Sequence, residues 1–175
     1  GLAQNFVRHK LELLNHGLGG HVFDSGYFDA DIGAAPDLVT IAYGTNDWGG
    51  RTREVVAAEC RGLVSAVRER CGDRTDVVVI TPLWRTNYAE THVGGTLREF
   101  ISCIADTASD VDGVRVVDGW KLVPHREELF VDGVHPNDSG MPLYGLELYR
   151  QLRSLGIEPQ GADASTASHQ EPQRF

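Results

Sequence analysis

The sequence predicts one α/β domain in which a mostly parallel sheet lies between layers of helices. Its 175 residues are enough for one domain with a substantial core and too few for two. Hydrophobic residues make up 41% and charged residues 23%, a normal globular composition. Short apolar runs alternate with longer amphipathic segments, which is typical of βα units. We therefore expect a single domain over residues 1–157.

Four short apolar runs are the predicted strands, at residues 11–15, 38–43, 77–81 and 114–117. Amphipathic helices are predicted over residues 52–70 and 95–109, because apolar residues recur there at spacings of three and four. A last helix is predicted over residues 139–155, following Pro136 and the capping candidates Asn137 and Asp138. The first ten residues also have a helical pattern.

Residues 158–175 are rich in Gln, Ser, Ala, Gly and Pro and almost free of apolar side chains. Such a segment does not offset its own ordering entropy, so we expect a disordered tail. The net charge of -9 disfavours nucleic acid and anionic membranes as partners. There is no signal peptide pattern and no membrane-spanning run, so the sequence leaves the location unknown and favours the cytoplasm only slightly. No initiator Met is present, and we expect that upstream sequence is missing.

Metal or cofactor chemistry finds no support in the sequence. Cys60, Cys71 and Cys103 lie in predicted helices, and an odd number without CxxC spacing predicts packed free thiols. The seven histidines include no H-x-x-x-H pair. We therefore expect no metal site and no cofactor.

Three segments follow predicted strands, where open α/β sheets gather their functional loops. The first, residues 15–21, reads Asn-His-Gly-Leu-Gly-Gly-His. Its glycines allow backbone amides to approach a ligand, but the same pattern also suits a plain tight turn. It matches neither the dinucleotide-binding pattern nor a phosphate loop with its lysine.

The second segment, residues 43–47, reads Tyr-Gly-Thr-Asn-Asp and follows the most hydrophobic strand. The side-chain NH2 of Asn46 is a neutral, directional donor of the kind that stabilises a developing oxyanion. Alternatively, Asn46 and Asp47 cap the next turn.

The third segment, residues 132–137, reads Asp-Gly-Val-His-Pro-Asn. Asp132 precedes His135 by three residues, so its carboxylate can accept the imidazole Nδ1–H and leave Nε2 free as a base. The alternative is an ordinary loop into a helix, with Asp132 solvated.

Together, the three segments in this order resemble the SGNH (GDSL-like) hydrolase family over about residues 6–155. The resemblance implies a flavodoxin-like three-layer α/β/α sandwich. It also implies that Gly20 and Asn46 bind the oxyanion, that His135 is the base and that Asp132 orients it. We expect these residues to line one cleft at the carboxyl edge of the sheet.

One block of the family is not found, because its Gly-Asp-Ser nucleophile motif stands on a first strand before the glycine segment. Ser25 follows an Asp but comes after that segment, and capping a short helix suits it better. We therefore expect the serine and the first strand upstream of Gly1. Without them, we expect this chain alone to be inactive and either poorly stable or self-associating.

Aromatic residues near these loops, Trp48, Trp84 and Tyr88, are candidates for binding an acyl group or a sugar. Packing is the alternative for all three. Arg85 suits an anionic substrate group, although an exposed arginine needs no such role.

The sequence thus favours a serine carboxylester hydrolase that acts on small-molecule or carbohydrate esters. The alternative is a pseudoenzyme or a module that binds carbohydrate or acyl groups without catalysis. A flavodoxin-like nucleotide-binding or receiver domain is disfavoured, because it would leave the pair of Asp132 and His135 unused.

Overall fold

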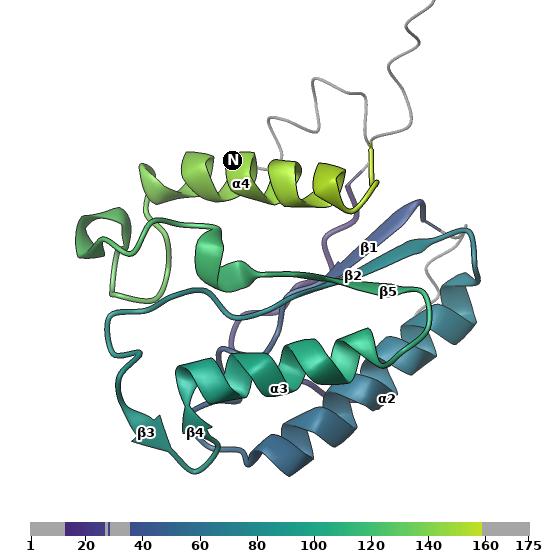
Figure 1. Cartoon of the computed structure of the whole chain (residues 1–175), viewed down its shortest axis with the longest axis horizontal. Coiled ribbons are helices and arrows are strands. Elements are labelled where there is room, and N and C mark those ends of the chain that lie inside the picture. The colour runs from purple at the N-terminus through teal and green to yellow at the C-terminus, as the bar shows by residue number, and fades with distance from the viewer. Residues whose placement is uncertain (1–12, 27, 29–35, 159–175) are drawn as a thin grey trace, which may run out of the picture.

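The computed structural model describes residues 13–26, 28 and 36–158 (Figure 1). Its main sheet has the order β1-β2-β5 and consists of β1 (Leu38–Ile41), β2 (Asp76–Ile80) and β5 (Val114–Val117). All pairings are parallel: Ile41 of β1 lies opposite Val79 of β2, which lies opposite Val116 of β5. This confirms the predicted α/β class with a parallel sheet.

Helices cover both faces of this sheet. Figure 1 shows α2 (Arg53–Cys71) and α3 (Leu97–Ser109) on one face and α4 (Gly140–Ser154) on the other. A small antiparallel hairpin of β3 (Thr91–His92) and β4 (Gly95–Thr96) precedes α3, and the sequence did not predict it. The order of layers is the predicted α/β/α sandwich.

The central strand β2 explains why its sequence is apolar without alternation. Val77 and Val79 belong to the core shared with α2 and α3, whereas Val78 and Ile80 belong to the core beneath α4. All four are buried because helices cover both faces of the strand. Because β2 pairs in parallel with both neighbours, the carboxyl ends of all three strands lie at one edge.

The predicted helices are confirmed with small changes at their ends, and polar side chains set those ends. The hydroxyl of Thr52 accepts a hydrogen bond from the backbone N–H of Val55 at 3.4 Å and caps α2. Thr96 and Glu99 form a reciprocal capping box at the start of α3. The side-chain oxygen Oδ1 of Asn137 accepts from the N–H groups of Ser139 and Gly140 at the start of α4, as expected for a capping residue.

The strand predicted at residues 11–15 is wrong where it is described, because residues 13–15 have no regular structure. The side chains of Leu13 and Leu14 are 54% and 58% exposed. Among the described residues, β1 pairs only with β2, so no neighbouring strand satisfies the backbone of this segment. Residues 11 and 12, the helix expected over the first ten residues, and the tail beyond Glu158 lie outside the described residues.

The three cysteines are free thiols, as the sequence predicted. Cys60 and Cys71 are buried and Cys103 is half-buried, and burial raises the pKa of the Cys60 thiol to about 12. None of the helices within the described ranges is long and apolar enough to cross a membrane.

Gly44 lies in the segment that connects β1 to Asn46. Its φ of 104° lies in the region that favours glycine. A Cβ there would lie 2.6 Å from Ile104 Cδ1 and 3.0 Å from Pro82 Cγ. The close packing of this backbone against α3 therefore fixes the path of the chain into the candidate site.

We predict that Gly44→Ala lowers the free energy of unfolding by about 1–3 kcal/mol from backbone strain alone, and further through the contact with Ile104. Gly49→Ala is the matched control, because nothing lies within 4 Å of its added methyl group. Urea denaturation of both variants measures the difference. Equal stability of the two variants would contradict this account.

Candidate active site

Four loops contribute the candidate residues: the glycine segment at residues 15–21, residues 42–48 after β1, residues 81–86 after β2, and residues 130–137 before α4. Two of them directly follow strands at their carboxyl ends. In Figure 1 the segment between β5 and α4 lies at the same end of the sheet as the β3–β4 hairpin. The fold thus gathers segments that are far apart in the sequence.

Asp132 and His135 form the expected pair. His135 Nδ1 lies 2.8 Å from Asp132 Oδ2, and the backbone N–H groups of Val134 and His135 donate to Asp132 Oδ1 at 3.0 and 2.8 Å. These bonds, foremost the one from the His135 backbone, hold the pKa of Asp132 well below its usual range. Among the described residues His135 Nε2 has no hydrogen-bond partner, which leaves it open for proton transfer.

The turn that carries this pair is closed by backbone contacts. Phe130 and Pro136 form an isolated antiparallel bridge, and the Val131 N–H donates to the His135 carbonyl at 2.8 Å. Gly133 has a φ of 78°, a conformation that L side chains rarely adopt, and this lets the chain fold back within three residues. Residues 130–136 therefore build the Asp132–His135 contact through bonds within their own turn.

Asn46 connects the second segment to the glycine segment. Its side-chain Nδ2 donates to the His21 carbonyl at 2.9 Å, which leaves its second N–H free. Gly20 lies at the third position of the turn from Leu18 to His21. Its φ of 79° is the value that this position has in a type II turn. Within the described part of the chain the Gly20 N–H has no acceptor, so both groups keep a donor available.

Asp47 is a residue whose importance the sequence did not reveal. Its side chain is fully buried and accepts from the Phe23 N–H at 3.2 and 3.1 Å and from Arg51 Nη1 at 3.3 Å. Arg51 Nη1 also donates to the Phe23 carbonyl at 2.6 Å. The predicted capping role is therefore incomplete: Asp47 and Arg51 clamp Phe23, just after the glycine segment. Only the i,i+4 spacing of the two charges could have suggested this pair.

Burial raises the pKa of Asp47, although the bonds from Phe23 and the charge of Arg51 act in the opposite direction. The two aspartates of the site thus differ in environment. Asp132 is exposed and held ionised by hydrogen bonds, whereas Asp47 is desolvated and structural.

The loop after β2 links the second segment to the turn of Asp132. The Thr86 N–H donates to the Gly133 carbonyl at 2.9 Å, and the Arg85 guanidinium carbon lies 5.2 Å from the centre of the Trp48 ring. No hydrogen bond joins Asn46 directly to His135 among the described residues. The structure therefore brings Gly20 near Asn46, and it brings Asp132 into contact with His135. The loop of Arg85 and Thr86 contacts the segments that carry both of these pairs.

The three aromatic candidates differ in how much of each side chain is exposed to solvent. Trp48 is 1% exposed, and its indole N–H donates to the Gly95 carbonyl at 3.0 Å. Trp84 is 8% exposed and stacks on His125 with 5.4 Å between ring centres. Tyr88 is 41% exposed and lies 6.0 Å from Trp84, centre to centre. The two tryptophans follow the packing alternative in this structure, and Tyr88 is the candidate ring that a ligand can reach.

Ser25 lies against α2. Its N–H donates to Glu59 Oε2 at 2.7 Å, and its Cβ packs where a side chain on Gly62 would stand. Ser25 is part of a turn, so the expected helix-capping role is not seen within the described residues. These contacts tie Ser25 to a helix and not to His135.

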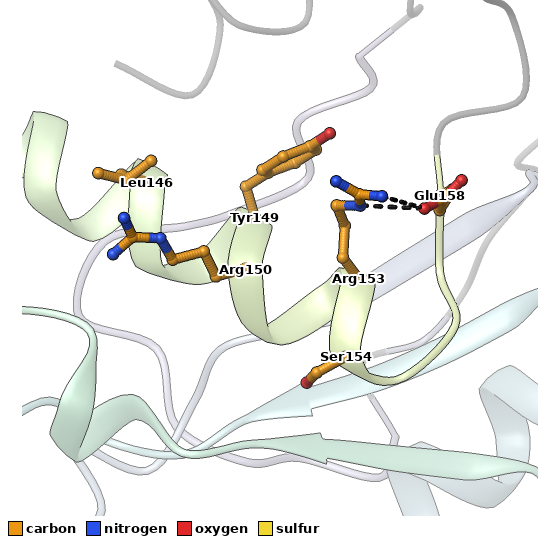
Figure 2. Close-up of a pocket in the computed structure, with 6 residues that line it drawn as sticks. All are labelled: Leu146, Tyr149, Arg150, Arg153, Ser154 and Glu158. Carbon is orange, nitrogen blue, oxygen red and sulfur yellow. Dashed lines mark hydrogen bonds and ion pairs between the residues drawn. The ribbon is translucent and has the colours of Figure 1, made fainter.

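A surface cavity of about 500 Å³ lies on the outer side of α4 and contains none of the residues discussed above (Figure 2). It is lined by Leu146, Tyr149, Arg150, Arg153, Ser154 and Glu158. Arg153 and Glu158 pair there at 2.8 Å, and Arg150 pairs with Glu147 at 3.6 Å. In the described ranges, no three His, Cys, Asp or Glu side chains gather as metal ligands do.

Comparison with known families gives a match over most of the chain. A model described as the GDSL-like Lipase/Acylhydrolase family matches residues 2–143. No curated protein matches the chain at a significant level.

Several solved structures share the fold. A possible lipase from Chitinophaga pinensis has a TM-score of 0.69 at 21% identity, covering 88% of this chain and 87% of its own. A carbohydrate esterase family 3 protein from Talaromyces cellulolyticus has a TM-score of 0.54 at 21% identity, with coverage of 69% and 58%. The lipase/acylhydrolase from Enterococcus faecalis has a TM-score of 0.52 at 23% identity, with coverage of 73% and 66%. This chain thus spans less than two thirds of the last two proteins.

We predict that Asp47→Ala lowers the free energy of unfolding by about 1–3 kcal/mol, because it leaves the buried Phe23 N–H without an acceptor. Asp47→Asn keeps one carbonyl oxygen in place and should cost less. Chemical denaturation of the three proteins measures both effects. A smaller loss for the alanine than for the asparagine variant would contradict the clamp.

The raised pKa of Asp47 also predicts a pH dependence. The folded state holds this proton more tightly than the unfolded chain does. The stability of the wild type relative to Asp47→Asn should therefore be greatest below about pH 3.9, the ordinary aspartate pKa, and fall as the pH rises through the raised value. Denaturation curves recorded from acid to neutral pH test the sign.

Proposed function

The chain belongs to the GDSL-like lipase/acylhydrolase family, and we propose that it provides the base and the oxyanion site of a serine carboxylester hydrolase. The observation that carries the proposal is the contact of 2.8 Å between His135 Nδ1 and Asp132 Oδ2, with Nε2 left open. A carboxylate on Nδ1 fixes the tautomer in which Nε2 accepts a proton.

In the proposed reaction, His135 Nε2 takes the proton of a serine hydroxyl while the serine oxygen bonds to the acyl carbon. Negative charge then develops on the former carbonyl oxygen, and the free N–H groups of Gly20 and Asn46 donate to it. The imidazolium, stabilised by Asp132, returns its proton to the leaving alcohol. Water releases the acyl group by the same steps in reverse order.

We place the serine in a segment N-terminal to Gly1, on a strand that pairs with β1. Two observations support this placement. Among the described residues β1 has a partner on one side only, and the apolar side chains of Leu13 and Leu14 are exposed. Ser25, the serine preceded by an aspartate, contacts α2 instead.

Small-molecule or carbohydrate esters are the proposed substrates. The paired Asp132 and His135 side chains are 53% and 76% exposed, so a bulky alcohol group can approach them. Tyr88 offers an exposed ring near Trp84 for stacking on a sugar or packing on an acyl group. The fold shared with the Talaromyces carbohydrate esterase agrees with this range of substrates.

The second candidate is a non-catalytic module that binds carbohydrate or acyl groups. It is favoured by one observation: within the described residues no serine hydroxyl bonds to His135 Nε2. Labelling with a serine-directed fluorophosphonate separates the two functions, because only an activated serine reacts.

We predict that His135→Ala lowers kcat by about 10²–10⁴-fold in a protein that includes the upstream serine, because the general base is lost. Asp132→Asn should also slow acyl transfer, because it favours the wrong tautomer. Neither should change stability greatly, since both side chains are exposed. Hydrolysis of p-nitrophenyl acetate measures the rates.

Ser25→Ala is the control for these variants and should keep the wild-type rate. Turnover that survives in His135→Ala, or a fluorophosphonate label on Ser25, would contradict the assignment.

We predict that Asn46→Ala lowers kcat by about 10²–10³-fold with a much smaller change in KM, because its hydrogen bond strengthens only as charge develops on the oxygen. Asn46→Asp keeps the size of the side chain but removes the donor, and it should lose as much. Steady-state kinetics with a short acyl ester gives both constants. An unchanged kcat would remove Asn46 from the oxyanion site.

A further inference from the structure

We infer that Arg85 determines specificity by binding a carboxylate group on the substrate. This inference rests on the proposed ester hydrolysis at the Asp132–His135 pair and adds a chemical feature to the substrate. Four properties of Arg85 carry it: its place beside the pair, its rigid support, its free donors and the charges around it.

Arg85 belongs to the loop that contacts the turn of the candidate base. The next residue, Thr86, donates its N–H to the carbonyl of Gly133, which lies between Asp132 and His135, at 2.9 Å. The charge of Asp132 acts on the guanidinium of Arg85 across this contact. A group bound to Arg85 therefore lies next to the place where an ester would react.

The guanidinium is held in position without using an acidic partner. Arg85 Nε donates to Asn87 Oδ1 at 2.6 Å, and Asn87 Nδ2 donates to Glu90 Oε2 at 2.9 Å. On its other side the group lies over the ring of Trp48 at 5.2 Å. Trp48 is itself buried and bonded to the Gly95 carbonyl, so the ring beneath the guanidinium is held in place.

The His92 side chain completes this support. Its ring meets Trp48 edge-on with 4.3 Å between ring centres, and its Nε2 lies 3.2 Å from Glu90 Oε2. Arg85, Asn87, Glu90, His92 and Trp48 thus form a closed ring of contacts. Such a ring fixes the direction of the guanidinium before any ligand arrives, which lowers the entropy lost on binding.

The two terminal nitrogens of Arg85 are free. Among the described residues they have no hydrogen-bond acceptor, and Arg85 forms no ion pair, in contrast to Arg51, Arg68 and Arg115. Arg85 is nevertheless half-buried, and this burial lowers its pKa. A positioned, partly desolvated guanidinium with a free pair of donors is the geometry that binds a planar carboxylate through two parallel hydrogen bonds.

The surrounding negative charges limit the negative charge that a ligand of Arg85 can carry. Glu90 and Asp132 both act on Arg85, and the whole chain carries a net charge of -9. A monoanionic carboxylate meets less repulsion from these groups than a phosphate dianion would. We therefore assign a carboxylate-bearing ester as the substrate class.

Binding of two small amides tests this inference without any ester bond. Succinamate carries a carboxylate, and succinamide has a neutral amide in its place. We expect the chain to bind succinamate at least tenfold more tightly than succinamide, and Arg85→Gln to abolish this preference. NMR titration gives both affinities, and the Arg85 Nε–H signal should shift with succinamate alone.

Arg98→Gln is the matched control. Arg98 also lies over a tryptophan, 4.6 Å from the Trp120 ring, and the substitution removes the same charge. The control should keep the preference for succinamate. If both variants lose the preference for succinamate equally, the preference comes from overall charge and the inference is wrong. The absence of any preference in the wild type would also overturn it.

Arg85→Lys keeps the charge but not the two-donor geometry, so it should retain only part of the preference. Thermal unfolding of each variant shows whether its fold is intact. If Arg85→Gln does not fold, a partial loss of preference in Arg85→Lys and a shift of the wild-type Nε–H signal with succinamate test the inference instead. Because neither probe can be hydrolysed as an ester, a failure of the proposed catalysis leaves this result unaffected.

Discussion

The site depends first on the buried carboxylate of Asp47. A desolvated carboxylate is costly unless donors surround it, and here the Phe23 backbone and Arg51 supply them. Those same contacts hold the glycine segment against the loop after β1, and the Asn46 side chain adds a bond to His21. The position of the proposed oxyanion donors is thus a consequence of satisfying one buried carboxylate.

Two aspartates in this small site have opposite environments and opposite pKa shifts. Burial raises the pKa of Asp47, whereas three hydrogen bonds from its own turn lower that of Asp132. The first suits a structural clamp between distant segments. The second suits a permanent negative charge beside His135, which a base needs when it becomes positively charged. Environment, and not residue type, separates the two roles.

The loop after β2 makes the site continuous. Thr86 bonds to the turn that carries Asp132, and Arg85 reaches over Trp48 beside the Asn46 segment. The ring of contacts around Arg85 holds a positive charge next to the proposed base while leaving its end groups free. A loop of this kind can alter which esters are accepted without changing the residues that transfer protons.

The sequence by itself determined the elements whose cause is local. Apolar runs predicted four strands, three of which the structure confirms, and helical spacing predicted the helices that become α2, α3 and α4. The spacing of Asp132 and His135 predicted their contact, because the turn between them closes on itself. Tertiary structure decided the rest. Residues 13–15 form no strand because a strand needs a neighbour, and Trp48 and Trp84 are buried by residues far away in the chain. The clamp of Asp47 on Phe23 and the free end of Arg85 likewise arise from contacts between distant segments, which no local pattern encodes.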